Sequence, residues 1–179
     1  MKGRYKVNKD KLLNENYVYL IIKNDAITRK IDQDILNFLK DRIKIKEPIR
    51  LKLTKEQVKI IKKEEWENKW TEPPKGYILD LVLKYEAQEV LVVPCEYMGK
   101  DTFEILHRLK GNHHIPFMCN HDSVRWIFRD KSQMERLFEY SDDILLEKDT
   151  EGNISFPECI MHTPDSKYEN DKLKECLFN

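Results

Sequence analysis

The feature that most constrains the fold is a short apolar run at residues 90–93, inside the sequence EVLVVP. Consecutive β-branched and aliphatic residues without a polar neighbour are typical of a central strand buried on both faces. A helix should follow, because Asp101 is a suitable N-cap, Glu104 stands three residues later and Gly111 can end the helix. Residues 115–119 then predict a second strand. This strand–helix–strand order has the length of a βαβ crossover.

Residues 17–53 repeat that order. Residues 17–23 are aromatic and β-branched, which favours a strand, and the helical spacing of apolar residues predicts a helix at about 33–44. Alternation at 49–53 predicts a half-buried strand. Thr54 and Gln57 form a capping box that should start a helix at about 55–69. Residues 77–86 are apolar on nearly all sides, which predicts a buried helix.

The C-terminal part gives weaker patterns. Residues 123–129 alternate, so we expect a strand with Trp126 in the core and Arg125 and Arg129 on the outer face. A helix is expected near 131–140. Residues 144–148 and 153–162 flank a turn and predict a hairpin, with its second strand placed at an edge by Pro157. The end of the chain is expected to dock back onto the domain.

These elements predict a single α/β domain over residues 1–179. We expect a mixed β-sheet of about five to seven strands with helices on at least one face, with an α+β arrangement as the alternative. The proline-containing break at 71–76 is too short for a domain linker. The four cysteines lack a CxxC pattern, which favours reduced thiols and a cytoplasmic location, and no apolar run is long enough to span a bilayer.

The net charge of zero hides a division along the chain. Residues 1–63 contain 18 Lys and Arg against 8 Asp and Glu, a net +10, whereas residues 64–179 carry a net −10, so that 77–179 form an acidic C-terminal part. A basic half can meet phosphates or an acidic protein surface. The alternative is that the two halves pack together and neutralise each other.

The first functional hypothesis follows from that division and from the lack of a complete catalytic set. It is a non-enzymatic binding or regulatory protein without a cofactor, whose basic half engages an anionic partner: nucleic acid, a nucleoprotein complex or a protein that it inhibits. No membrane is involved and the oligomeric state stays open. The residues expected to bind are Lys55, Lys59, Lys62, Lys63, Arg125 and Arg129.

The alternative hypothesis is an enzyme. His121 and Asp122 follow a predicted strand, where an imidazole and a carboxylate could do acid–base chemistry, with His114 nearby, so a hydrolase or phosphodiesterase-type enzyme is the second hypothesis. Zinc is its optional cofactor, because two thiolates and two imidazoles suit a tetrahedral site. The candidate zinc ligands are Cys119, His121, Cys159 and His162. The usual glycine-rich nucleotide-binding motifs are missing from the sequence.

Overall fold

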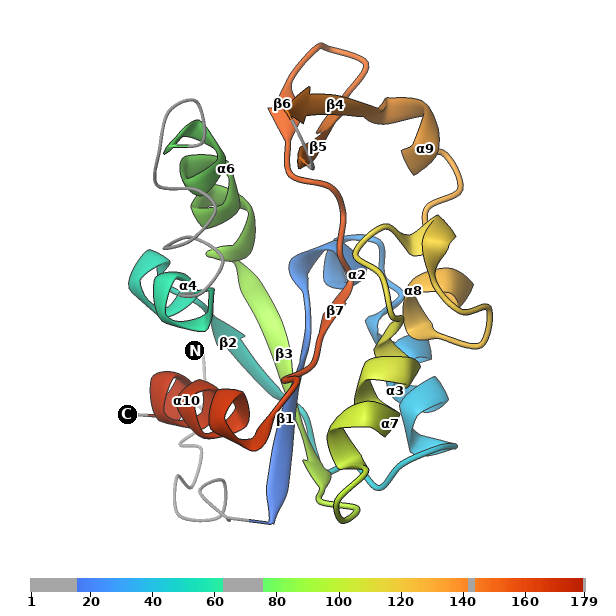
Figure 1. Ribbon diagram of the computed structural model, residues 1–179, viewed down its shortest axis with the longest axis vertical. Coiled ribbons are helices and arrows are strands. Elements are labelled where there is room, and N and C mark those ends of the chain that lie inside the picture. The colour runs from blue at the N-terminus through green and yellow to red at the C-terminus, as the bar shows by residue number, and fades with distance from the viewer. Residues whose placement is uncertain (1–15, 63–75, 142–143, 179) are drawn as a thin grey trace, which may run out of the picture.

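The computed structural model describes residues 16–62, 76–141 and 144–178. A four-stranded sheet forms its centre (Figure 1), in the order β2-β3-β1-β7. Every pairing within it is antiparallel. The strands are β1 (Tyr17–Ile22), β2 (Ile49–Lys52), β3 (Glu89–Glu96) and β7 (Met161–His162).

β3 is the central strand that the apolar run predicts. It pairs with β1 from Tyr17 opposite Glu96 to Ile22 opposite Leu91, and with β2 on its other side. Since β1 and β2 are both antiparallel to β3, they run parallel to each other with β3 between them. The predicted crossover from β1 to β2 therefore exists, with a third strand inserted between the two strands that it connects.

Helices cover both faces of this sheet (Figure 1). One face packs against α2 (Asn24–Thr28), α3 (Asp32–Lys40), α7 (Thr102–Lys110) and α8 (Val124–Ile127). The other packs against α4 (Lys55–Ile61), α6 (Gly76–Glu86) and α10 (Lys167–Phe178). Strand alternation divides the core accordingly: Leu20 and Ile22 of β1 face the first group, and Tyr19 and Ile21 face the second.

A smaller antiparallel sheet packs beside α6. It contains β4 (Leu137–Ser141), β5 (Ile144–Lys148) and β6 (Ile154–Ser155) in that order, and the short helix α9 (Gln133–Arg136) leads into it. Leu146 and Phe138 pack in the same hydrophobic cluster as Ile78 and Val82 of α6, so the small sheet shares a core with the central one.

Three predicted elements are wrong. Residues 115–119 form a 3-10 turn, η1 (Pro116–Met118), because Pro116 has no N–H for a strand ladder. Residues 123–129 form α8 instead of a strand, and the Ser123 hydroxyl accepts from the Trp126 N–H as its N-cap. The helix at 131–140 is reduced to α9, since the chain turns extended at Leu137.

The predicted hairpin is confirmed in its first half only. β5 and β6 pair around the turn at 149–152, but Pro157 interrupts the second strand and residues 161–162 cross to the central sheet as β7. The tail forms α10, and its last residues, Leu177 and Phe178, are buried as expected.

The class is an α/β fold with antiparallel sheets flanked by helices, as predicted, although two sheets replace the single mixed sheet. The order strand–helix–strand–strand–helix–strand with β1 and β3 at the centre is a ferredoxin-like arrangement. Within the described ranges, no helix is both long and apolar enough to cross a membrane.

Candidate active site around His162

Two polar side chains stand at the same end of the central sheet. His162 lies opposite Ile21 in the β1–β7 ladder, so it shares the face of Ile21 and Tyr19. Lys23 follows two residues after Ile21 on that face, and its N–H donates to the Ile160 carbonyl at 2.9 Å, which extends the pairing. The sheet therefore places an imidazole and an ammonium on the face that α4, α6 and α10 cover.

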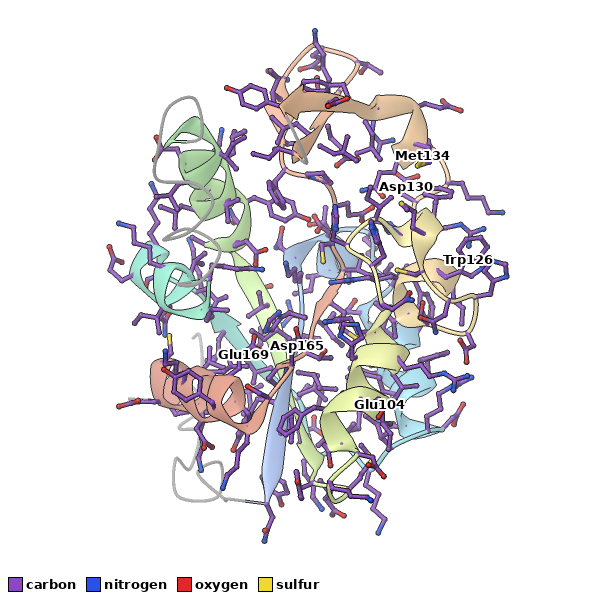
Figure 2. All side chains as sticks on the ribbon, viewed as in Figure 1. Glu104, Trp126, Asp130, Met134, Asp165 and Glu169 are labelled. Atoms are coloured by element: carbon purple, nitrogen blue, oxygen red, sulfur yellow. The ribbon has the colours of Figure 1, made fainter. Side chains whose placement is uncertain are left out.

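His162 faces a carboxylate from the first turn of α10. Its Nε2 lies 3.3 Å from Oε1 of Glu169, although the two atoms are not aligned as a hydrogen bond and Nε2 has no other partner among the described residues. The Asp165 N–H donates to Oε2 of Glu169 at 2.6 Å, which fixes that carboxylate. Figure 2 shows Asp165 and Glu169 where β7 leads into α10.

Burial sets the charge of this imidazole. The His162 side chain is only 14% exposed, and burial, followed by the positive charges of Lys62 and Lys23, lowers its pKa against the opposing effect of Glu169. His162 is therefore neutral near pH 7. With the proton on Nε2, facing Glu169, the lone pair is on Nδ1. A neutral, oriented imidazole of this kind can act as a nucleophile or a base.

Lys23 is charged although it is buried. Burial works against its charge, but Cys159 and Glu86 together raise the pKa of Lys23 above its usual value, and its ammonium forms an ion pair with Glu86 at the end of α6. Both side chains of this pair are under 10% exposed. Burial raises the pKa of Glu86, but Lys23 and Lys62 outweigh it and lower the value to about 2.

A second contact ties α6 to the segment before β7. The Tyr85 hydroxyl donates to Asp25, and the Cys159 N–H donates to the Tyr85 oxygen at 2.8 Å. Cys159 thus enters the site beside Lys23. Arg125 reaches it from α8, with Nη2 at 3.1 Å from its sulfur. The charges of Arg125 and Lys23 outweigh burial and lower the pKa of the Cys159 thiol.

The four lysines predicted to bind a partner lie in different environments. Lys55 and Lys59 are exposed on α4, and Lys63 lies outside the described residues. Lys62, at the end of α4, is half-buried, and its charge acts on both Glu86 and His162. One residue of this set therefore belongs to the site, as a neighbour of buried groups instead of part of a solvated surface.

The predicted arginine pair is wrong as an exposed pair. Residues 124–127 are helical, so the alternation that placed Arg125 outward does not apply, and Arg125 is 8% exposed. Arg129 is half-buried over the ring of Trp126, with 4.0 Å between its guanidinium carbon and the ring centroid. Trp126 is half-buried too, and is absent from both core clusters.

The residues predicted for the hydrolase lie on the surface. His121 is exposed and stacks on Trp126 with ring centroids 3.9 Å apart, and Asp122 is exposed beside Asn120 and Arg108. His114 is exposed and stacks on His113. The structure thus places this group apart from the buried site, on the loop and helix that replace the two predicted strands.

The four predicted zinc ligands are not brought together. The Cys119 thiol donates to the His113 carbonyl at 3.0 Å, Cys159 contacts Arg125, His162 faces Glu169, and His121 is on the surface. Within the described part of the chain, no three His, Cys, Asp or Glu side chains are arranged to hold a metal ion.

Sequence reasoning missed Lys23, Glu86 and Glu169. One signal was present: Lys23 directly continues an apolar strand, and a charged residue there must find a buried partner. The other two could not be found, because Glu86 and Glu169 lie 63 and 146 residues from Lys23 and reach the site only through the packing of α6 and α10.

No protein-family model matches this chain, and no curated protein resembles it in sequence. Solved structures do resemble it. A nucleoside-diphosphate kinase from Borrelia burgdorferi, a transition-state mimic with bound vanadate and ADP, has a TM-score of 0.65 at 16% identity, with 91% of this chain and 86% of that chain covered.

Two further nucleoside diphosphate kinases have the same fold. The enzyme from Encephalitozoon cuniculi, without ligand, has a TM-score of 0.60 at 16% identity and covers 92% of this chain and 90% of its own. The enzyme from Aquifex aeolicus has a TM-score of 0.62 at 15% identity, with 92% and 95% covered. At this identity the likeness establishes the fold.

These comparisons correct both functional hypotheses drawn from the sequence. Neither a non-enzymatic protein that binds an anionic partner nor a zinc-assisted hydrolase agrees with structural neighbours that are kinases over nearly the whole chain. Those hypotheses rested on the charge division and on the adjacent residues His121 and Asp122. The buried site around His162 depends on neither of these two features. The chain has the fold of a nucleoside-diphosphate kinase.

Proposed function

We propose that this protein transfers a phosphoryl group between nucleotides and that His162 is the group that accepts it. The observation that carries the proposal is the setting of His162: a buried, neutral imidazole, 3.3 Å from the Glu169 carboxylate and next to Lys23 and Lys62. The likeness to nucleoside-diphosphate kinases supports the nucleotide as substrate, because one of those structures holds ADP and vanadate.

The chemistry follows from the two ring nitrogens. Glu169 faces Nε2, so the Nδ1 lone pair attacks the terminal phosphorus of a nucleoside triphosphate. The bond from that phosphorus to the bridging oxygen breaks, and the diphosphate leaves with the electron pair. A second nucleoside diphosphate then attacks the phosphohistidine with its terminal oxygen, which restores the imidazole. Each half-reaction balances without a further reactant.

The surrounding charges suit this reaction. Phosphoryl transfer depends mainly on positioning and on cations that stabilise the charge of the transferred group. Lys23 and Lys62 supply such charge on the side of α4 and β1. Glu169 opposes the desolvation of the imidazole and balances the positive charge that develops on the ring. A cytoplasmic location belongs to the same proposal, because all four cysteines are free thiols.

The test is a transfer assay with one nucleoside triphosphate as donor and a different nucleoside diphosphate as acceptor. We expect ping-pong kinetics for the parent, and a loss of at least about 10³-fold in kcat for His162→Ala, the size expected when a nucleophile is removed. His121→Ala is the matched control, because it removes an exposed imidazole, and should retain activity within about twofold of the parent. Equal losses in both variants would contradict the proposal.

A further inference from the structure

Cys159 is a half-exposed thiol that the proposed transfer reaction does not use. It lies in the segment between β6 and β7, and its sulfur is 3.1 Å from Nη2 of Arg125. Its N–H donates to the Tyr85 oxygen at 2.8 Å and to Oδ2 of Asp25 at 3.2 Å. Contacts with α6 and α2 therefore fix the backbone that presents this sulfur to the guanidinium.

Arg125 has an unused donor at this place. It is only 8% exposed. Over the described residues, its two Nη atoms donate to the Cys159 sulfur and to three neutral carbonyl oxygens, those of Gly111, His113 and Met161. Its Nε is buried and has no partner there. A buried donor without an acceptor costs free energy, so a new oxygen atom on the sulfur would be favoured beside this guanidinium.

The charges around Cys159 favour its thiolate form. Burial opposes ionisation, but the positive charges of Arg125 and Lys23 outweigh burial and the negative charge of Glu86, so the pKa of the Cys159 thiol is lowered. The thiolate is the nucleophilic form of cysteine, and oxidation selects thiolates that small molecules can reach. Cys159 combines both conditions, since it is half-exposed and its sulfur faces a cation.

The other three cysteines lie in environments that keep them neutral. Burial raises the pKa of Cys95 to about 12. Burial also raises the pKa of Cys119, whose thiol donates to a backbone carbonyl at 3.0 Å. Cys176 is half-exposed like Cys159, but burial and then the charge of Glu175 raise its pKa. Cys176 therefore differs from Cys159 in the sign of the charge beside the sulfur, and is its matched comparison.

We infer that Cys159 is a site of reversible oxidation by small hydroperoxides, and that Arg125 holds the resulting sulfenic acid. The thiolate sulfur attacks one oxygen of the peroxide, the O–O bond breaks, and the second oxygen leaves with the electron pair. It takes up a proton and becomes water or an alcohol. The sulfur is oxidised and the peroxide is reduced.

The guanidinium suits both states of the sulfur. Before the reaction Arg125 donates to the thiolate, and afterwards its Nε–H and Nη2–H can donate to the oxygen that the sulfur has gained. Two molecules of a small thiol then restore the cysteine and leave as a disulfide, with release of water. This inference goes beyond the proposed function and does not depend on it, because it rests on the contacts of Cys159 and not on the phosphoryl acceptor.

The first experiment needs no substitution. The reduced parent protein is treated with hydrogen peroxide in the presence of dimedone, which traps sulfenic acids, and each cysteine peptide is quantified by mass spectrometry. An ordinary thiol is only a few per cent thiolate at pH 7, so we expect Cys159 to be labelled at least about tenfold faster than Cys176. Equal rates at the two cysteines, or faster labelling of Cys176, would overturn the inference.

Reversibility is measured on the same protein without dimedone. Peroxide should add one oxygen atom to the Cys159 peptide, and dithiothreitol should then return that peptide to its original mass. A peptide that keeps its added oxygen after dithiothreitol would show that the oxidation is irreversible and would contradict the inference.

A second experiment tests Arg125. Arg125→Met removes the guanidinium, and Arg108→Met is the matched control because the Arg108 side chain is 75% exposed on α7. With folding verified by circular dichroism, dimedone labelling of Cys159 should slow at least about tenfold in Arg125→Met and stay within about twofold of the parent in Arg108→Met. An unchanged rate in Arg125→Met would overturn the role of Arg125. If Arg125→Met does not fold, the comparison of Cys159 with Cys176 in the parent decides.

Discussion

The chain places its histidines in two contrasting settings. His121 is exposed and flat against Trp126, in a loop between η1 and α8. His162 is buried at the end of a strand, opposite the carboxylate of Glu169. In sequence the first is the more suggestive, with Asp122 and Ser123 directly beside it. In space the second has the oriented carboxylate and the neighbouring cations.

The environment of an imidazole, more than its sequence neighbours, decides what it can do. Water screens the charges around His121 and competes for its hydrogen bonds. Burial around His162 strengthens each interaction and keeps the ring neutral. Functional groups gather where burial and a specific charged partner coincide. Substitutions around His162 should therefore change stability and catalysis, whereas equivalent substitutions around His121 should not.

The largest effect on stability is expected at Lys23. Lys23→Met leaves Glu86 charged, buried and unpaired, which should lower the free energy of unfolding by about 3–5 kcal/mol in a urea titration. The double variant Lys23→Met/Glu86→Leu removes both charges and should recover most of that loss. On the exposed side, Arg108→Met breaks the ion pair with Asp122 and should leave the urea midpoint unchanged. A Lys23→Met midpoint equal to that of Arg108→Met would refute the contrast.

The next effect concerns the orientation of the imidazole. Glu169→Gln keeps the size of the side chain but removes the charge that faces Nε2, so we expect kcat for phosphoryl transfer to fall about 10–100-fold with a small change in KM. Asp122→Asn is the equivalent change beside His121 and should leave kcat as in the parent. A loss confined to KM in Glu169→Gln would show that this carboxylate positions substrate instead of His162.

The smallest effect is on the pH dependence of stability. Burial lowers the pKa of His162 in the native state. Below pH 6.5 the imidazole of the unfolded chain therefore becomes protonated while the native imidazole stays neutral, and the free energy of unfolding decreases as the pH falls. The contribution of the neutral His162 to the free energy of unfolding is fully present above pH 6.5. We expect the parent to lose more of its free energy of unfolding between pH 7.5 and 5.5 than His162→Asn, by up to about 1.4 kcal/mol for each pKa unit of the shift.

The measurement compares two variants because a second buried group titrates in the same pH window. Burial raises the pKa of Glu158 to about 7, so this group stabilises the native state as the pH falls through the same window and opposes His162. The effect of Glu158 is common to parent and variant and cancels in the difference. His121→Asn removes an exposed imidazole and should follow the parent curve. A His162→Asn curve parallel to the parent curve would mean that His162 is not held neutral by burial.

Much of the fold could be predicted from local patterns. The apolar runs of β1 and β3 and the capping box of Thr54 and Gln57 identify elements that the structure confirms. Prediction failed at residues 115–129, because the short apolar segment at 115–119 and the alternation at 123–129 fit strands as well as they fit helical turns. The Ser123 hydroxyl caps the helix that forms at 124–127, a local signal that the alternation outweighed in the prediction.

The site was less predictable than the fold. Its charged residues come from α6, α8, β7 and α10 and from the ends of β1 and α4, and the spacing of these elements in sequence is unrelated to their contacts. His162 was recognised as a possible ligand because a cysteine precedes it by three residues. Its partner, Glu169, became visible only when the tail proved to be a helix docked beside β7. Sequence patterns describe periodic burial, whereas this site depends on long-range pairing.

Whether His162 accepts the phosphoryl group is best tested by a search for the phosphorylated intermediate. The protein is incubated with a nucleoside triphosphate, quenched at alkaline pH where phosphohistidine survives, digested and analysed by mass spectrometry. We expect an acid-labile phosphoryl group on His162, which disappears when a nucleoside diphosphate is added. A phosphoryl group on His121 or another residue, or none under conditions in which the protein transfers phosphate, would contradict it.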